Sequence, residues 1–333
     1  MRLLVVAGAR PQFVKAAALL PALKRRAETI LVDTGQHADP RMVDAHFAGL
    51  GLPEPDLRLE VPGFQRSVRM TVMVGSLQEV MAEHAPDRVF VMGDTDTALA
   101  GATAAVGAGL PVAHVEAGAR SGEPDLPEEQ NRLRIDEIAD LLFCATPAHA
   151  GNLAGRGGVH VVGDVMADVL LAREREIRAR TPTRGPYAVL TLHRAATADD
   201  PAAVARVLEA AGATGVPVVF PRHPRTRLAG EPPKTIEVRP PLPYLDFLGL
   251  VAGARFVLTD SGGLQKEAYL LGVPCITLRH ATEWSETVAA GWNVLVGTDP
   301  ARIAAAIAAP PRAAHRPALY GDGAAATRIA ELV

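Results

Sequence analysis

The stretch FVLTDSGGLQKEAYLLGVP, residues 256–274, is the clearest guide to the fold of this chain. It opens with a short apolar run that contains β-branched residues, and Asp260-Ser261-Gly262-Gly263 follows. Apolar residues then recur at helical spacing, so the order predicts a strand, a glycine turn and a helix. The two glycines let a ligand approach the backbone, and the unpaired N–H groups of the first helical turn favour an anion such as phosphate.

One turn into this predicted helix stands Glu267, whose carboxylate can accept hydrogen bonds from neutral hydroxyls such as those of a ribose. A nucleoside joined to a sugar through a diphosphate satisfies both features, because it offers an anion and hydroxyls in one molecule. The alternative on this stretch alone is an ordinary helix of an α/β protein, capped by Asp260 or Ser261, with glycine for tight packing.

Size and composition exclude several classes of protein. The 333 residues are enough for two domains of ordinary size, and 48% of them are hydrophobic, which supplies a core for each. The net charge of −3 and the lack of a basic run give no electrostatic footprint for nucleic acid. No apolar stretch is long enough to span a membrane, and Cys144 and Cys275 are expected to be buried thiols. We therefore expect a globular, cytoplasmic protein.

Strands alternate with helices along the chain, which predicts doubly wound α/β domains with parallel sheets. A charged helix over residues 166–180 runs into the Pro- and Gly-containing segment 181–186, and we place a domain boundary there. The expected strands cover residues 2–7, 30–33, 88–92, 112–116, 141–144 and 159–162 in the first series, and 187–191, 217–220, 235–238, 256–259, 274–278 and 293–295 in the second. Helices are expected at residues 13–28, 40–50, 67–84, 95–108, 128–139, 147–155 and 324–333.

Acidic side chains follow two neighbouring strands of the first series. Asp94 comes after the strand expected at residues 88–92, and Glu116 ends the strand expected at residues 112–116. Ligands of such sheets bind outside the carboxyl ends of the strands, and a charge there is costly if it stays dry. We therefore favour chemistry or substrate binding over helix capping for both carboxylates. Glu128 in the next helix can bring a third carboxylate to the same pocket, although it also complements the helix dipole.

Basic and imidazole side chains also gather at predicted strand ends. Arg10 and Lys15 stand at the start of the first helix and suit a diphosphate, with a solvated helix end as the alternative. In the second series, His193 and His223 each follow a strand and stand next to arginines, which favours an anionic ligand. The polar run at residues 279–286 follows another strand and can close over that ligand.

Seven motifs occur in the order and spacing of a known family. The motifs are Gly8-Ala9-Arg10-Pro11, Thr34-Gly35-Gln36-His37, Gly93-Asp94-Thr95, His114-Val115-Glu116-Ala117-Gly118, Pro127-Glu128-Glu129-Gln130-Asn131-Arg132, His193-Arg194 and Thr259-Asp260-Ser261-Gly262-Gly263. With these motifs the chain resembles the non-hydrolysing UDP-N-acetylglucosamine 2-epimerases, and the resemblance covers nearly its whole length.

The resemblance implies two Rossmann-like domains of the glycosyltransferase-B type, with the active site in the cleft between them. Because the C-terminal helix returns to the first domain in such folds, the domains are expected at residues 1–180 with 318–333, holding the catalytic carboxylates, and at residues 181–317, binding UDP. The resemblance further implies a homodimer, neither NAD nor a required metal, and reversible conversion of UDP-GlcNAc to UDP-ManNAc. In this reaction UDP is eliminated across C1 and C2 and re-added, with the proton returned to the other face of C2.

The resemblance also assigns roles residue by residue. The catalytic candidates are Asp94, Glu116, Glu128 and His193. The groups expected to bind substrate are Arg10, Lys15, Arg132, Ser261, Gly262, Gly263 and Glu267. Some members bind a second UDP-GlcNAc as an activator, at positions that match Gln36, His37, Arg194 and His223.

Four features depart from the family pattern. Asp96 stands where members often have Thr, Lys266 where they often have Glu, and Asp39 where the activator site usually has Gln. The run Thr282-Glu283-Trp284-Ser285-Glu286 replaces Thr-Glu-Arg-Pro-Glu, and looks closer to archaeal members and to those that act on UDP-diacetamido uronic acids. The alternatives left open are epimerisation of such a uronic acid, a UDP-sugar glycosyltransferase, and a non-catalytic UDP-sugar sensor.

Overall fold

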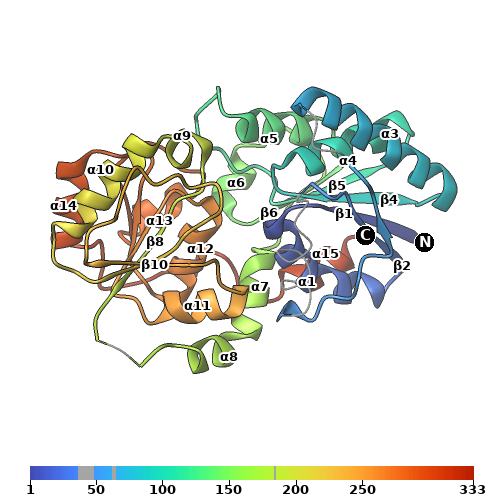
Figure 1. Cartoon of the computed structure of the whole chain (residues 1–333). Coiled ribbons are helices and arrows are strands. Elements are labelled where there is room, and N and C mark those ends of the chain that lie inside the picture. The colour runs from blue at the N-terminus through green and yellow to red at the C-terminus, as the bar shows by residue number, and fades with distance from the viewer. Residues whose placement is uncertain (37–48, 62–64, 184) are drawn as a thin grey trace. The chain divides into compact units, whose positions relative to one another are not determined.

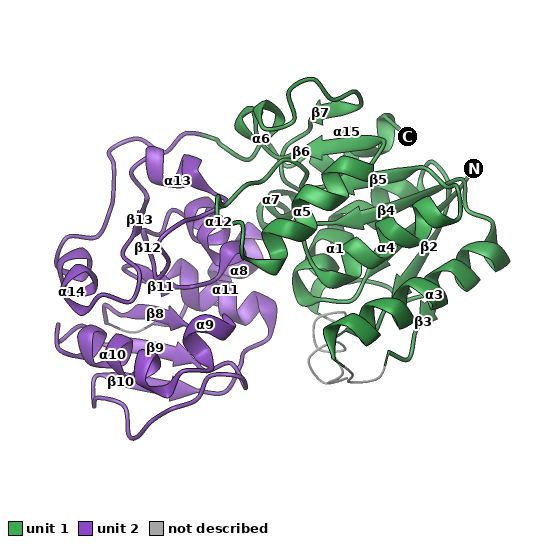
Figure 2. Ribbon diagram, turned by 90° about the horizontal axis from the view of Figure 1, so that it is seen from above, with its two compact units in different colours: residues 1–172, 318–333 green, residues 173–317 purple. Residues whose placement is uncertain are grey.

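Figure 1 shows the computed structural model of the chain, which describes residues 1–36, 49–61, 65–183 and 185–333. The chain divides into two compact units, which Figure 2 colours separately. Unit 1 contains residues 1–172 and 318–333, and unit 2 contains residues 173–317. Each unit is built around a parallel sheet, as the alternation of strands and helices predicts. Among the described helices, none has both the length and the apolar character needed to cross a membrane.

Unit 1 is built on a sheet with the strand order β3-β2-β1-β4-β5-β6-β7. Its central strands read as continuous apolar runs because helices cover both faces, and residues 3–7 of β1 are fully buried. The strand order reverses between β1 and β4, and ligands of doubly wound sheets bind at such a switch point. The strands are β1 (Arg2–Ala7), β2 (Glu28–Asp33), β3 (Leu57–Arg58), β4 (Arg88–Met92), β5 (Val112–Val115), β6 (Leu141–Cys144) and β7 (Val159–Val161).

The C-terminal helix belongs to unit 1, where it packs against α1 and α7. The buried carboxylate of Asp168 in α7 accepts hydrogen bonds from the backbone N–H groups of Ala325 and Ala326, at 3.1 and 2.7 Å, and so caps this helix. The helices of the unit are α1 (Arg10–Lys24), α3 (Arg66–His84), α4 (Asp96–Gly107), α5 (Pro127–Ile138), α6 (Pro147–Gly151), α7 (Val165–Ala172) and α15 (Ala325–Glu331).

Unit 2 repeats the same design, with the strand order β10-β9-β8-β11-β12-β13 and a switch point between β8 and β11. The strands are β8 (Ala188–Thr191), β9 (Val218–Pro221), β10 (Ile236–Arg239), β11 (Val257–Thr259), β12 (Cys275–Thr277) and β13 (Asn293–Leu295). The helices are α8 (Glu174–Ala179), α9 (Ala195–Ala198), α10 (Pro201–Gly212), α11 (Tyr244–Ala252), α12 (Gly262–Leu271), α13 (Ser285–Ala289) and α14 (Pro300–Ala308).

The structure differs from the expected elements in three places. The helix expected at residues 166–180 is interrupted at Arg173, and its second part, α8, packs against α11 and ties to it through Arg180 and Asp246 at 2.5 Å. The division between the units therefore falls before Arg173 and not after residue 180. The two-residue strand β3 was not expected, because it lies in a Pro- and Gly-rich segment. The helix expected at residues 40–50 lies almost entirely outside the described residues.

Candidate active site

The turn after β1 is tied to the end of β4 by the buried side chain of Gln12. Its Oε1 accepts hydrogen bonds from the N–H groups of Gly8 and Ala9 at 3.0 Å each, and its Nε2 donates to the carbonyl of Met92 at 3.1 Å. A Cβ at Gly8 would lie 2.0 Å from Thr34 Oγ1, so only glycine fits there. These bonds fix the unit 1 switch point, where Arg10 begins α1 with a half-buried side chain.

Lys15 and Glu116 form an ion pair at this switch point. Nζ of Lys15 lies 2.8 Å from Oε1 of Glu116, and the two side chains are 4% and 11% exposed. Glu116 has a φ of 73°, in the left-handed region that residues with a Cβ seldom occupy. A Cβ at Gly93 would lie 2.7 Å from this Nζ and 3.3 Å from this Oε1, so the glycine leaves the space that the pair occupies. Lys15, which the resemblance assigns to the substrate, thus pairs with Glu116 within unit 1.

Arg132 binds both Asp94 and Glu129, a carboxylate for which the sequence predicted no role. Arg132, buried in α5, donates from Nη2 to Oδ2 of Asp94 and from Nη1 to Oε2 of Glu129 at 3.0 Å. The N–H and hydroxyl of Ser121 also donate to Oε2 of Glu129, at 2.9 Å each. Burial alone raises the pKa of Glu129, but the hydrogen bonds from Ser121 and the charge of Arg132 outweigh it and hold that pKa below its usual value. Glu128, the predicted third carboxylate, is half-buried on the neighbouring face of the helix.

Asp96, one of the departures from the family pattern, is held by cations of α3. Its carboxylate accepts hydrogen bonds from Arg66 at 2.8 and 2.9 Å, and from Arg69 at 2.9 Å. Asn131 donates to Oδ1 of Asp96 at 3.3 Å and to the carbonyl of Asp94 at 2.9 Å, which links the two acids. Burial raises the pKa of Asp96, but the hydrogen bonds from Arg66, Arg69 and Asn131 together lower it below its usual value.

The predicted activator residues are only partly described. Oε1 of Gln36 accepts hydrogen bonds from the N–H and the hydroxyl of Thr97, at 3.2 and 2.6 Å, at the start of α4 in unit 1. In unit 2 the rings of His193 and His223 lie 6.0 Å apart between centroids, and Arg194, which follows His193 in the sequence, is half-buried. His37 and Asp39 lie outside the described residues.

A buried histidine and aspartate of unit 1 were quoted in no predicted role. Nδ1 of His114 lies 2.7 Å from Oδ1 of Asp136, and its Nε2 lies 2.9 Å from the carbonyl oxygen of Gly93. Oδ2 of Asp136 accepts from Nη1 of Arg120 at 2.6 Å and from the N–H of Gly118 at 3.1 Å. Burial raises the pKa of Asp136, but the hydrogen bond and charge of His114, with the charge of Arg120, hold it below its usual value.

At the switch point of unit 2, Asp260 orients His193. The fully buried carboxylate accepts from the N–H groups of His193 and Arg194, at 3.0 Å each, and lies 3.1 Å from Nδ1 of the His193 ring. Burial raises the pKa of Asp260, but the hydrogen bond and charge of His193 and the two N–H donors lower it below its usual value. The carboxylate beside Nδ1 favours the tautomer with hydrogen on Nδ1, and the His193 side chain is 41% exposed.

The first turn of α12 has the form that the sequence predicts. Ser261 caps the helix by accepting from the N–H of Leu264 at 3.3 Å, and Gly262 and Gly263 are half-buried beside it. A Cβ at Gly262 would lie 2.2 Å from Oε1 of Glu283, so a side chain has no room there. Glu267 is buried, and its Oε1 accepts a hydrogen bond from the hydroxyl of Tyr244 at 2.7 Å.

The run at residues 279–286, expected to close over the ligand, packs against the start of α12 in unit 2. The hydroxyl of Thr282 donates to Oε1 of Gln265 at 2.7 Å, and Nε2 of Gln265 donates to the carbonyl of Ser261 at 3.1 Å. Nζ of the buried Lys266 lies 3.9 Å from the centre of the Trp284 ring, so two departures from the family pattern are in contact. These contacts place the run beside the start of α12.

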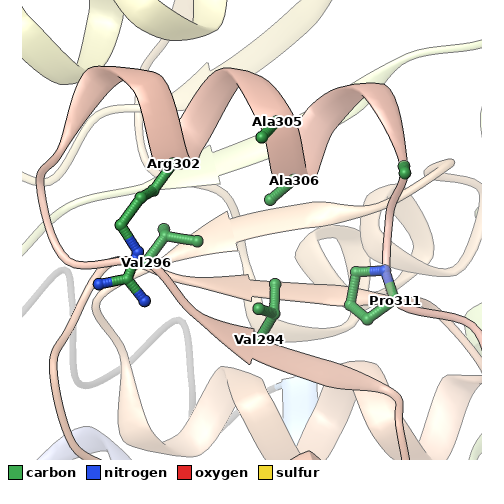
Figure 3. A pocket seen from close by; sticks show the side chains of 7 residues that line it. Val294, Val296, Arg302, Ala305, Ala306 and Pro311 are labelled. Carbon is green, nitrogen blue, oxygen red and sulfur yellow. The ribbon is translucent and has the colours of Figure 1, made fainter.

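A separate cavity of about 300 Å³ opens between β13 and α14 (Figure 3). Valine, alanine and proline side chains make most of its lining, and Nη2 of its one charged side chain, Arg302, donates to the carbonyl of Leu295. Such a lining offers few groups to a nucleotide sugar, and none of the predicted site residues contributes to it. Within the described ranges, no cluster of three or more His, Cys, Asp or Glu side chains has the geometry of a metal site.

Two units, each with a doubly wound parallel sheet, give the chain a glycosyltransferase-B type fold, which its structural neighbours share. A calicheamicin glycosyltransferase of this class, 16% identical with a TM-score of 0.55, shares the fold alone. The chain belongs to the UDP-N-acetylglucosamine 2-epimerase family, whose model matches residues 21–333.

The relatives that match the chain cover most of its length. It is 39% identical to the UDP-2,3-diacetamido-2,3-dideoxy-D-glucuronate 2-epimerase of Pseudomonas aeruginosa, over 99% of both chains. It is 34% identical to the UDP-N-acetylglucosamine 2-epimerase of Methanocaldococcus jannaschii, over 92% of this chain and 91% of the relative. The solved structure of UDP-GlcNAc 2-epimerase from that archaeon, in complex with UDP-GlcNAc and UDP, matches with a TM-score of 0.92 and 32% identity, over 100% of this chain and 99% of the other.

Proposed function

We propose that this chain interconverts UDP-GlcNAc and UDP-ManNAc by reversible inversion at C2 of the sugar. The observation that carries the proposal is the pair of carboxylates at one switch point, Asp94 on Arg132 and Glu116 on Lys15, in a chain of this family. The C2–H bond has no adjacent ketone, so it is a poor acid. Elimination of UDP, which breaks the C1–O and C2–H bonds, avoids that difficulty and needs acid/base groups beside the sugar.

In this proposal Asp94, Glu116 and Glu128 move the proton at C2, while unit 2 holds the leaving group. The amides of the first turn of α12 and the ring of His193 receive the diphosphate, because charge develops there as the C1–O bond breaks. Glu267, held by Tyr244, binds the ribose hydroxyls. Arg10 and Arg132 complete the sugar and phosphate contacts.

A second substrate is favoured by one comparison. The Pseudomonas aeruginosa relative, which is named for a UDP-diacetamido glucuronate, is 39% identical over 99% of both chains. The same elimination chemistry would then act on a sugar with an acetamido group at C3 and a carboxylate at C6. We further propose a cytoplasmic homodimer, and activation by a second UDP-GlcNAc at Gln36, His37, Arg194 and His223.

Incubation with UDP-GlcNAc in D2O, without an acceptor, tests the activity. We expect deuterium at C2 and the appearance of UDP-ManNAc, and the same assay with the UDP-diacetamido uronic acid ranks the two substrates. A glycosyltransferase or a sensor would leave C2 unlabelled. If no UDP-hexosamine of such a panel gains deuterium, the proposal fails.

The variants Asp94→Asn and Glu116→Gln test the two carboxylates. Each should lower turnover by at least about 100-fold, the range of general acid/base catalysis, with a much smaller change in UDP affinity. Glu137→Gln is a matched control, because this acid lies in α5 of the same unit with a 64% exposed side chain. Equal losses of UDP binding and of turnover would assign Asp94 and Glu116 a structural role.

A further inference from the structure

We infer that His114 and Asp136 are positioning residues that hold both proposed acid/base carboxylates in place through the backbone on either side of them. The kinetic part of this inference rests on the proposed function, and the structural part does not. His114 lies in β5, two residues before Glu116, and Asp136 lies in α5. Both are buried, with 0% and 3% of their side chains exposed.

The His114 ring meets a hydrogen-bond acceptor at each nitrogen. The carbonyl of Gly93, 2.9 Å from Nε2, can only accept a hydrogen bond, so Nε2 donates to it. On the other side, Oδ1 of Asp136 lies 2.7 Å from Nδ1, and its neighbours keep Asp136 in the carboxylate form, which also only accepts. The ring therefore lies between a backbone carbonyl and a buried carboxylate, within hydrogen-bond distance of both.

The two ends of this arrangement reach the residues beside the catalytic candidates. Gly93, which accepts from His114, directly precedes Asp94. Gly118, whose N–H donates to Asp136 at 3.1 Å, follows Glu116 by two residues. Arg120 closes the same turn from the other side, with Nη1 2.6 Å from Asp136. A shift of the His114 ring or of the Asp136 carboxylate would thus move the backbone around both Asp94 and Glu116.

Backbone strain at these positions shows why such support is needed. Gly93, Glu116 and Gly118 have φ angles of 68°, 73° and 77°, and Glu116 carries a Cβ in that region. For Glu116, which has a Cβ, this conformation is strained and persists only where the surrounding structure dictates it, whereas the two glycines adopt it readily. A buried ion pair adds little net stability over apolar side chains of similar volume. Stability alone therefore does not account for His114 and Asp136, whereas positioning of the strained turn does.

The test compares His114→Gln and Asp136→Asn with a matched control, Asp168→Asn. Like Asp136, Asp168 is a buried carboxylate of unit 1 that accepts from backbone N–H groups, but it caps α15. The first two variants should lower kcat by about 30-fold or more, since a misplacement of 1 Å can cost 100-fold, with KM and the UDP dissociation constant changed less than about threefold. Asp168→Asn should lower the melting temperature and leave kcat within about threefold. If the buried variants do not fold, Arg120→Gln replaces them, because it removes a partner of Asp136 at a side chain that is 20% exposed. It should lower kcat in the same direction.

Hydrogen–deuterium exchange gives a readout that needs no activity. In His114→Gln and Asp136→Asn we expect faster exchange in peptides that cover residues 92–97 and 114–120, and no such change in Asp168→Asn. Unchanged exchange in both peptides, or an equal loss of kcat in the Asp168→Asn control, would overturn the inference. If the wild-type protein labels no UDP-hexosamine at C2, the proposed function fails while the exchange result still decides the positioning role.

Discussion

Replacing Lys15 with methionine tests the strength of its pair with Glu116. The two charged atoms lie 2.8 Å apart, and the side chains are 4% and 11% exposed. Removing one partner of a buried ion pair costs about 3–5 kcal/mol, because the other charge stays behind in a dry site. Glu116 keeps a little contact with solvent, so we expect the free energy of unfolding of unit 1 to fall by about 3 kcal/mol. For a unit of this size the melting temperature should fall by roughly 6–12 °C.

The double variant Lys15→Met/Glu116→Gln separates the pair from its surroundings. Because it removes both charges of this pair, the double variant should be at least about 1 kcal/mol more stable than Lys15→Met alone. Urea unfolding of the wild type, the two single variants and the double variant gives the coupling energy, and Arg134→Met in the exposed pair with Glu137 should change little. A coupling energy below about 0.5 kcal/mol would refute the reasoning, since the two side chains would then act independently.

Three further predictions follow from the same geometry. Gly93→Ala should destabilise unit 1 by about 1–3 kcal/mol in urea unfolding and lower kcat, because its φ is 68° and its Cβ would press on the ammonium of Lys15. Lys266→Met should lower the free energy of unfolding of unit 2 by about 1–2 kcal/mol, because it removes the cation–π contact with Trp284. Trp284→Leu should therefore destabilise the Lys266→Met variant less than it destabilises the wild type, since that contact is already broken. The pKa values of Asp136 and Asp260 are lowered in the folded protein, so both carboxylates stabilise the fold fully above about pH 4. This stabilisation is lost as the pH falls through the lowered pKa values. The free energy of unfolding of Asp136→Asn, measured in urea, should therefore fall less steeply with acid pH than that of the wild type.

The sequence predicted the strand ends of the fold well, because parallel strands buried on both faces are marked by apolar runs and by the polar residues that follow them. The strands containing or preceding Asp94, Glu116, His193 and Ser261 all lie within one residue of their expected bounds. The break at Arg173 could not be predicted, since the charged pattern continues through it and only packing against α11 separates α8 from α7.

The partners of the site residues were harder to predict than the residues themselves. Helix α5 places Glu129, Arg132 and Asp136 on one buried face, at the spacing i, i+3 and i+7, and that run of polar residues was a signal the sequence did contain. The pairing of Lys15 with Glu116 had no such signal, because 101 residues separate the two. Lys266 and Trp284 were each identified as departures from the family pattern, yet only the structure shows that they touch.

The hydrogen bonds suggest a division of work between the two units. In unit 1, the cations that meet Glu116 and Asp94 come from α1 and α5 of the same unit, and the turn between these acids is held by His114 and Asp136. In unit 2, Gln265 donates a hydrogen bond to the carbonyl of Ser261 at the start of α12, and Asp260 lies beside the ring of His193. Each half of the proposed site is therefore organised by the fold of its own unit. Under the proposed function, the strained turn of unit 1 is then held for proton transfer by unit 1 itself, without help from the ligand.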